Sequence, residues 1–270
     1  SSSSNITFVR PPYFIISGFS DIPNINYYYV FLFFVYIVSV LGNTAVMAVI
    51  LLDRNLRTPK YVAVFNLAWT DLLGSTVQVP KVLDIFVFNQ RLISYNDCMA
   101  FIFFSYTCLS MQSLNLVVLS YDRLVAITFP LHYHMKVTHR FMFSLIAFFW
   151  VSSITAVLIA VGLLTTLSIC KSVIINSYFC DYGKIYMLAC NDYTPAHVTI
   201  HLFTVLMIWL PLIFILFSYS YIGYSLRKHL HPNGRIINLS LSSVIPPMLN
   251  PFIYVLQTQE IKKSIKKLLK

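Results

Sequence analysis

The sequence predicts an all-α membrane protein in which each long helix crosses a lipid bilayer. Of the 270 residues, 58% are hydrophobic and only 10% are charged, whereas about 25% are charged in an ordinary soluble domain. The charged residues gather in short clusters between long apolar runs. The net charge of +10 therefore indicates loops at a membrane surface and not a nucleic-acid partner. Helices are expected in the apolar runs because lipid offers no hydrogen-bond partner to an unpaired strand.

Six apolar segments reach the length of about 20 residues that a membrane-spanning helix needs. They lie at about 27–52, 61–88, 97–127, 141–169, 198–226 and 236–257, within a helix bundle that covers residues 27–258. The segment before the bundle, residues 1–26, begins with a polar stretch and lacks the apolar core of a cleavable signal peptide. Residues 259–270 alternate lysine pairs with apolar residues and are expected to form an amphipathic tail helix.

The basic residues set the expected orientation. They concentrate in alternate loops and in the tail: Arg54, Arg57, Lys60, Arg123, Lys136, Arg140, Arg227, Lys228, Lys262, Lys263, Lys266, Lys267 and Lys270. By the positive-inside rule these parts are cytoplasmic and the N-terminus is extracellular. Asn5, in the sequon Asn5-Ile6-Thr7, is then expected to carry a glycan on the outer side.

Four cysteines lie on the expected outer side and predict two disulfide bonds. Cys98 opens the third span, and Cys170, Cys180 and Cys190 lie in the loop between the fourth and fifth spans. An oxidising compartment favours their pairing, and spacing alone leaves three connectivities open. Cys108 falls in the middle of the third span and is interpreted as a small packing residue.

Short motifs recur along the spans in a fixed order. Those that resemble the rhodopsin-like G-protein-coupled receptors are Gly42-Asn43, "NLAWTD" ending at Asp71, Trp150, Pro211 and "NPFIY" (250–254). Those that resemble the odorant (olfactory) receptors within that family, in the wording of the fish-type branch, are "LRTPKY" (56–61), "SYDRLVAITFPLHY" (120–133), Ser218-Tyr219 and "PPMLNPFIY" (246–254). The resemblance covers the chain from about Phe14 to Leu269.

This resemblance implies a function and a set of partners. It implies a seven-helix receptor, not an enzyme, that binds a small-molecule odorant in the outer half of the bundle. The receptor would activate a stimulatory, olfactory-type heterotrimeric G protein and raise cyclic AMP. It would lie in the plasma membrane of sensory cilia, with the bilayer as its surroundings, no nucleic-acid partner and no cofactor beyond a sodium ion. The resemblance also implies that Cys98 pairs with Cys180 and Cys170 with Cys190.

The pair Asp122-Arg123 stands at the end of the apolar third span and is interpreted as a conformational switch. In the closed state Arg123 would pair with Asp122, and in the open state it would support a docking helix of the G protein. The resemblance adds four residues to this switch: Tyr219, Asn250, Pro251 and Tyr254. The alternative is that Asp122-Arg123 only anchors a helix at the lipid interface. The motifs that follow the pair favour the switch.

Asp71 lies near mid-bilayer depth, where an unpaired acid is costly. Two roles are open for it. The resemblance implies a sodium site formed by Asp71, Gln112 and Asn250, and the other role is a structural hydrogen-bond hub that also involves Asn43. Nearer the outer end, Lys81 and Asp84 lie three residues apart and are expected to pair.

The ligand pocket is expected between the third, fifth and sixth spans. Its candidate residues combine apolar walls with a few hydroxyl groups, as suits small organic molecules: Ser105, Tyr106, Leu109 and Ser110 on the third span, and Phe203, Thr204 and Met207 on the fifth. Ser105 stands where amine receptors carry an acid, so a ligand ammonium would lack that partner. The other reading of the aromatic and methionine side chains is plain packing.

The sixth of the seven spans is not visible in the sequence. The ten steps from Leu226 to Ile236 reach at most about 35 Å when fully stretched, and they carry Arg227, Lys228 and Arg235. Either a span and its flanks are missing, which we favour, or the chain turns back and places its lysine-rich tail outside. The alternatives to a working odorant receptor are a truncated receptor that does not signal and a receptor for another small ligand. A secondary transporter is not favoured, because the sequence shows no inverted repeats.

Overall fold

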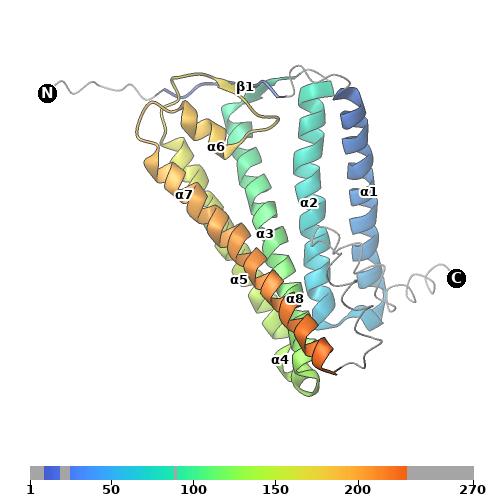
Figure 1. Cartoon of the computed structure of the whole chain (residues 1–270). Helices are drawn as coiled ribbons and strands as arrows, with labels where there is room; N and C mark the ends of the chain where they lie inside the picture. The colour runs from blue at the N-terminus through green and yellow to red at the C-terminus, as the bar shows by residue number, and fades with distance from the viewer. Residues whose placement is uncertain (1–8, 19–24, 88–89, 230–270) are drawn as a thin grey trace. The chain divides into compact units, whose positions relative to one another are not determined.

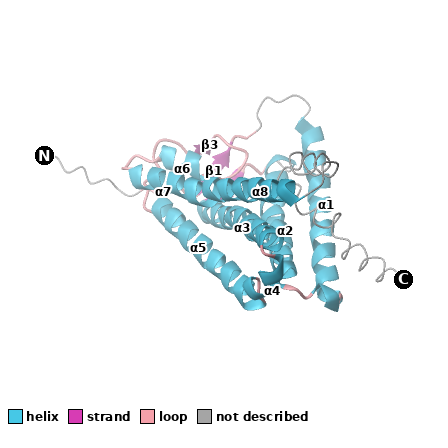
Figure 2. Cartoon of the chain, turned by 60° about the horizontal axis from the view of Figure 1, so that its bottom comes forward, coloured by secondary structure: helices cyan, strands magenta, loops and turns pink. Residues whose placement is uncertain are grey.

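The computed structural model describes residues 9–18, 25–87 and 90–229, and this part of the chain is almost wholly helical (Figure 1, Figure 2). The long helices are α1 (Ile25–Leu52), α2 (Pro59–Val87), α3 (Tyr95–Thr128), α5 (His139–Thr165), α7 (Thr194–Thr204) and α8 (Leu210–His229). The short helices are α4 (Tyr133–Lys136), α6 (Tyr182–Ile185), η1 (Arg54–Leu56), η2 (Pro130–His132) and η3 (Tyr186–Leu188). One π-helical turn, η4 (Val205–Trp209), joins α7 to α8. The strands are β1 (Tyr13–Ile16), β2 (Leu92–Ser94) and β3 (Ile174–Ile175).

The helices follow the predicted spans closely. Within the described ranges, four helical stretches are long and apolar enough to cross a membrane, at Tyr27–Leu52, Tyr95–Thr128, His139–Thr165 and Thr194–Ser225. α2, with 29 residues, is long enough as well, but its Asp71, Lys81 and Asp84 make it more polar. The expected helical membrane architecture is therefore confirmed, and the sixth predicted span and the tail lie outside the described residues.

Two features of local sequence set the helix ends. α3 stops at Thr128 because Pro130 has no amide hydrogen and disfavours helical geometry in the residue before it; Phe129 accordingly has φ −133° and ψ 58°. α5 ends at Thr165, four residues before the expected limit of 169. The reason is that the next residues belong to a disulfide-bonded loop, in which Ile169 forms a β-bridge with Ala189.

The chain divides into two compact units. Unit 1 consists of Ser1–Ser39, Leu73–Leu109 and Ser153–Val205, and unit 2 of the remaining segments. Each unit has its own cluster of buried apolar side chains.

A small sheet, which the sequence analysis did not predict, forms part of unit 1. Its order is β2-β1-β3, with β1 antiparallel to β2 and parallel to β3. Figure 2 shows β1 and β3 next to α6. Phe14 and Ile16 of β1 are fully buried and pack in a cluster with Cys98, Ile102 and Leu164. Residues 13–16 are thus an integral part of this unit.

The core of unit 2 joins α2, α3 and α5. Tyr61, Leu119, Val137 and Met142 are almost completely buried in one cluster. The cluster includes Leu56 from η1, the turn in which the Asp53 carboxylate caps the backbone by accepting a hydrogen bond from the Asn55 amide. The short connection between α1 and α2 is therefore fixed in two ways: the Asp53 cap holds the turn, and the buried Leu56 side chain attaches it to the core.

Candidate functional site

Two predicted pocket residues meet in unit 1. The Tyr106 ring of α3 lies 5.8 Å from the Phe203 ring of α7, in a tilted arrangement. A third ring, Tyr182 of α6, lies 6.3 Å from Tyr106. The sequence analysis missed Tyr182, although its position two residues after Cys180 could have placed it near the start of the third span. Together the three rings make an aromatic wall.

Ser105 is next to this wall in sequence and is 5% exposed. Its hydroxyl group makes no hydrogen bond within the described part of the chain, and the same is true of the buried Thr107 hydroxyl. Leaving a buried polar group unpaired costs about 1–3 kcal/mol. Residues two apart on a helix do not share a face, so the two hydroxyls cannot serve one ligand. Both residues flank Tyr106 in sequence, and Ser105 is the one that the sequence analysis placed in the pocket, so we take Ser105 as the candidate to receive a polar ligand group.

The remaining predicted pocket residues differ in what they can offer. Leu109 is 41% exposed. The Thr204 hydroxyl donates a 2.8 Å hydrogen bond to the Ile200 carbonyl one turn back, so its proton is already used. Ser110 is fully buried and Met207 is half-buried in the π-helical turn; both belong to unit 2. The residues that the structure brings together are therefore Tyr106 and Phe203.

The loop over this wall is held by two disulfide bonds. The structure joins Cys98 to Cys180 and Cys170 to Cys190, as the resemblance implied, with Cα–Cα distances of 5.6 and 5.9 Å, which are normal for disulfides. Cys98 lies in the first turn of α3, and Cys180 comes directly before Asp181, which caps α6. The first bond thereby places α6, and with it Tyr182, against α3.

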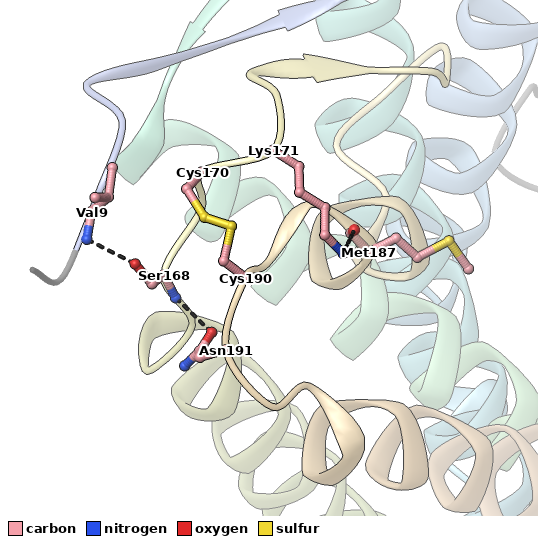
Figure 3. Close-up of a disulfide and its surroundings, with 7 residues drawn as sticks. All are labelled: Val9, Ser168, Cys170, Lys171, Met187, Cys190 and Asn191. Carbon is pink, nitrogen blue, oxygen red and sulfur yellow. Dashed lines mark hydrogen bonds between the residues drawn. A yellow bond between two sulfur atoms is a disulfide. The ribbon is translucent and has the colours of Figure 1, made fainter. Parts of the chain in front are cut away.

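Hydrogen bonds complete this loop (Figure 3). The Ser168 hydroxyl accepts from the Val9 amide at 2.9 Å, and the Ser168 amide donates to the Asn191 side chain at 2.9 Å. Lys171 donates to the Met187 carbonyl at 3.2 Å. Val9, Ser168 and Asn191 are thus joined to one another beside the Cys170–Cys190 disulfide.

Tyr182 is a neutral hydrogen-bond donor in this arrangement. Burial raises the pKa of its hydroxyl to about 12, because the charged form would lose its hydration. The hydroxyl donates to the Ala196 carbonyl at 3.3 Å. α6 is therefore attached to α3 by a disulfide and to α7 by a hydrogen bond.

The predicted pair on α2 is present as well. The Lys81 ammonium lies 3.5 Å from the Asp84 carboxylate, and both side chains are about one-third exposed. A pair this exposed contributes little to stability.

The predicted switch residues lie in unit 2. Asp122 is 1% exposed, and its carboxylate accepts a 2.6 Å hydrogen bond from the Tyr133 hydroxyl of α4. The charges of Arg123 and Lys60 also act on this carboxylate. The sequence analysis paired Asp122 with Arg123 alone and missed Tyr133, eleven residues downstream. Tyr219 of α8 lies near Arg123, close enough for the two groups to interact electrostatically.

The turn that carries Tyr133 also exposes a set of apolar side chains. Phe129 is 48% exposed, Leu131 92% and Met135 76%. The Lys136 ammonium lies 3.8 Å from the centre of the Phe129 ring, a cation–π contact. Exposed apolar groups clustered beside a positive charge are typical of a protein interaction surface. We call Phe129, Leu131 and Met135 the apolar turn.

Asp71 has Gln112 as its hydrogen-bonding partner across α2 and α3, so two of the three predicted sodium-site residues lie together. The third, Asn250, lies outside the described residues. A carboxylate and an amide oxygen are hard donors that suit a small cation. They are equally suited to a hydrogen-bond hub, and Asn43 is half-buried on α1 in the same unit.

A polar chain of four side chains, which the sequence analysis did not predict, lies near Asp71. The Trp150 indole donates to Asn66 at 3.0 Å, Asn66 donates to Asn115 at 2.6 Å, and Asn115 donates to Thr70 at 3.2 Å. These bonds join α5, α2 and α3. Asn115 gave no signal in the sequence because a single amide in an apolar run does not reveal its partners.

Several predicted residues have no structural account. Asn5, Asn250, Pro251 and Tyr254 all lie outside the described ranges. Their roles stay predictions.

Comparison with known proteins adds an independent line of information. The profile of the "7 transmembrane receptor (rhodopsin family)" matches residues 42–240. The chain is 31% identical to olfactory receptor 7D2 of Homo sapiens, over 95% of this chain and 94% of that protein. It is 32% identical to human olfactory receptor 1J1, over 87% of this chain and 84% of that protein. It is 31% identical to olfactory receptor 1E16 of Mus musculus, over 89% of this chain and 88% of that protein.

The length of one alignment bears on the missing span. The alignment with olfactory receptor 7D2 has 294 positions, whereas this chain has only 270 residues. At least 24 positions of the relative, the difference between the two numbers, therefore have no counterpart here. This is enough for one membrane span of about 20 residues.

Proposed function

Because the chain belongs to the rhodopsin family of seven-transmembrane receptors, and within it to the olfactory receptors, we propose that it detects a small odorant. The ligand would bind against the wall formed by Tyr106, Tyr182 and Phe203. The single observation that carries this location is the buried Ser105 hydroxyl, which has no hydrogen-bond partner among the residues that the structure describes. It can donate to a carbonyl, ether or hydroxyl oxygen of the ligand. The rings supply the apolar contact that a small organic molecule needs.

The two disulfides support this site by fixing the loop that closes it. Since α6 is held to α3 by Cys98–Cys180 and to α7 by the Tyr182 hydroxyl, the aromatic wall is preorganised. A preorganised wall lowers the entropy cost of binding, because fewer protein side chains have to be ordered when the ligand arrives. This favours recognition of small ligands that offer few contacts.

The second half of the proposal is coupling to a heterotrimeric G protein at the apolar turn and Arg123. Phe129, Leu131 and Met135 would enter an apolar surface of the G protein. The Asp122 carboxylate is buried and is not part of that surface. It accepts a hydrogen bond from Tyr133 and is attracted by nearby cations. Opening of the bundle would free Arg123 to support a docking helix, with Tyr219 beside it. This is a two-state element biased by a ligand that binds the open state better.

The finer features of the proposal follow from the sequence. The G protein is of the stimulatory, olfactory type and raises cyclic AMP; the N-terminus is extracellular, as the basic loops indicate. The receptor would lie in the plasma membrane of olfactory cilia, and the resemblance of its motifs to the fish-type branch supports membership of that branch. A phylogenetic tree of fish and mammalian olfactory receptors tests the assignment to the fish-type branch. Grouping of this chain with the mammalian receptors would contradict it.

We propose a sodium ion at Asp71 and Gln112 that favours the closed state. The supporting observation is the contact between the two side chains within unit 2. Sodium should weaken agonist binding to the native chain and have no such effect on Asp71→Asn. Equal sodium effects on both would leave the structural hub as the role of Asp71.

The test of the whole proposal compares the chain as it stands with a version that regains a sixth span. The span and its flanks from olfactory receptor 7D2 are inserted between Lys228 and His231, and both proteins are expressed with the olfactory G protein. The restored receptor should raise cyclic AMP in response to an odorant panel, and Arg123→Ala should abolish the response at equal surface expression. A normal response from Arg123→Ala would contradict the coupling mechanism.

The truncated, non-signalling receptor is the second candidate, and the 24 or more positions of the relative without a counterpart favour it for the chain as it stands. A response from the restored receptor only would identify the native chain as such a truncated form. A response from both would show that the remaining spans suffice.

A further inference from the structure

Two histidines stand on successive turns of α7. The ring centres of His197 and His201 lie 4.4 Å apart, with an angle of 38° between the planes. His197 is half-buried and His201 is exposed. Phe203 points to another face of the helix, since residues two apart do not share a face. The pair faces away from Phe203 but stands one ring from the aromatic wall, because Tyr186, which packs on His197, lies 6.1 Å from Tyr182.

We propose that His197 and His201 chelate a divalent transition-metal ion, with Zn²⁺ as the representative ion. Imidazole nitrogens four residues apart on a helix lie on one side and can bind the same ion. Each nitrogen binds Zn²⁺ at about 2.0–2.1 Å in tetrahedral geometry, which places the two ring centres roughly 5 Å apart. The observed 4.4 Å lies within easy side-chain adjustment of that value.

The surroundings hold the first imidazole in place. The Tyr186 ring lies 5.6 Å from the His197 ring, and Tyr193 stacks on Tyr186 at 5.6 Å. Lys171 lies over the Tyr193 ring, 5.6 Å from its centre. The backbone around His197 is also fixed, because its amide donates to the Tyr193 carbonyl at 2.9 Å. His201, being exposed, can turn to complete the pair.

The donor set defines the kind of site. Within the described ranges, no three His, Cys, Asp or Glu side chains gather as a metal cluster. The nearby Asp192 carboxylate accepts a hydrogen bond from the Thr194 amide at the start of α7. Cys170 and Cys190 are joined in a disulfide. The ion would therefore have two protein ligands and keep open positions for water, unlike a closed structural zinc site. Imidazole favours Zn²⁺, Cu²⁺ and Ni²⁺ over Ca²⁺ and Mg²⁺.

The experiment must separate this pair from the chain's other histidines. Five of the seven lie elsewhere, at His132, His134, His139, His229 and His231, and replacing these five with glutamine leaves only the pair. Zn²⁺ binding to this purified chain in detergent is then measured by calorimetry. One ion per chain is expected, and His197→Ala and His201→Ala should each weaken binding roughly tenfold or more, because the second ligand then no longer acts intramolecularly.

The matched control keeps two histidines but changes their spacing. His201→Ala combined with Leu202→His moves the second imidazole by one residue to another face of the helix, and Leu202 is itself exposed. This variant should bind no better than His201→Ala alone. Cu²⁺ added to the two-histidine chain should show two imidazole nitrogens by electron paramagnetic resonance.

Equal Zn²⁺ affinity in the two-histidine chain and in His197→Ala or His201→Ala would overturn the proposal. So would equal affinity in the respaced control. Peptide mapping that finds Cys170–Cys190 intact in each variant verifies that α7 and its loop are folded. The measurement needs no odorant and no G protein, so its outcome is independent of the proposed receptor function.

Discussion

The hydroxyl group of Tyr133 lies 2.6 Å from a carboxylate oxygen of Asp122. This bond joins the short helix α4 to the end of α3, and it makes the buried acid depend on a side chain from the following turn. The exposed residues of the apolar turn flank Tyr133 on both sides in sequence. A partner that docks on the turn would therefore act on the position of Asp122 through this one bond.

Replacing Tyr133 with phenylalanine should raise basal signalling. The change removes the donor to a buried carboxylate, and hydrogen bonds to charged groups are worth about 1.5–3 kcal/mol. Loss of that restraint should populate the open state of the restored receptor without ligand. The measurement is basal cyclic AMP at matched surface expression. Tyr121→Phe, which removes a hydroxyl from the same helix end but keeps the ring pair with Phe141, is the control, and equal basal levels in both variants would contradict the prediction.

Cys98→Ser should prevent delivery of the protein to the cell surface. The bond to Cys180 attaches α6 to α3, and removal of a native disulfide commonly costs 2–5 kcal/mol. Surface staining relative to total protein measures the effect. Cys108→Ser is the matched control, because Cys108 is buried and outside both disulfides. Peptide mapping that finds Cys98 free in the native protein would refute the pairing.

Ser105→Ala should separate ligand recognition from stability. The Ser105 hydroxyl makes no hydrogen bond within the described ranges, so its removal should leave the melting temperature unchanged or slightly raised. Potency should fall about fivefold, equivalent to about 1 kcal/mol, for odorants that accept a hydrogen bond. Dose–response curves for hydrocarbon and oxygenated odorants measure the difference.

Thr107→Val is the control for Ser105, as it removes another buried, unpartnered hydroxyl from a different face of α3. Ser105→Leu should change potency unequally across ligands by filling space beside Tyr106. The proposed pocket is misplaced if Ser105→Ala and Thr107→Val shift every odorant equally.

Asn115→Leu should destabilise unit 2. Asn115 accepts from Asn66 and donates to Thr70, so its loss leaves the half-buried Asn66 amide without this acceptor and removes a buried hydrogen bond, at a cost of about 1–3 kcal/mol. Thermal unfolding in detergent measures the loss. Ser120→Ala is a matched change on the same helix, since that hydroxyl donates to the Val117 carbonyl one turn back and joins no other helix in the part of the chain that the structure describes. A smaller shift for Asn115→Leu than for Ser120→Ala would show that the polar chain is unimportant.

Asn5→Gln should remove a glycan from the protein, visible as a mobility shift that glycosidase treatment reproduces.

An epitope placed after Lys270 should be stained only in permeabilised cells. Staining of intact cells would instead indicate that the tail is outside, as expected if the chain turned back after Leu226.

The sequence could predict most of the helical architecture because long apolar runs have few other solutions in lipid. It could also predict that Cys98, Cys170, Cys180 and Cys190 pair. The pairing itself came from the resemblance to a family, since spacing does not choose among three connectivities. Composition thus reveals whether a segment is a membrane-spanning helix or a loop. It does not reveal which other segments that segment contacts.

The contacts that the sequence could not predict depend on chain geometry over longer distances. Tyr133 reaches Asp122 only because Pro130 ends α3 and the chain turns back at η2. The segment "YFII" (13–16) is too short to signal a strand, and its partners lie far along the chain. Thr204 looked available for a ligand, but a helical threonine can donate to the carbonyl one turn earlier.

The position of β1 at the centre of its sheet has a consequence for biosynthesis. β1 leaves the ribosome long before either partner, and β3 follows about 160 residues later in the chain. At translation rates of about 5–20 residues per second, this separation lasts roughly 10–30 s. Until β2 emerges, about 80 residues after β1, both edges of the strand are unpaired, and the edge that β3 covers stays unpaired for the whole interval. Phe14 and Ile16 meanwhile lack the part of their core that lies after Ile102 in the chain. Chaperone protection of this short segment during synthesis would therefore determine how much receptor reaches its native fold.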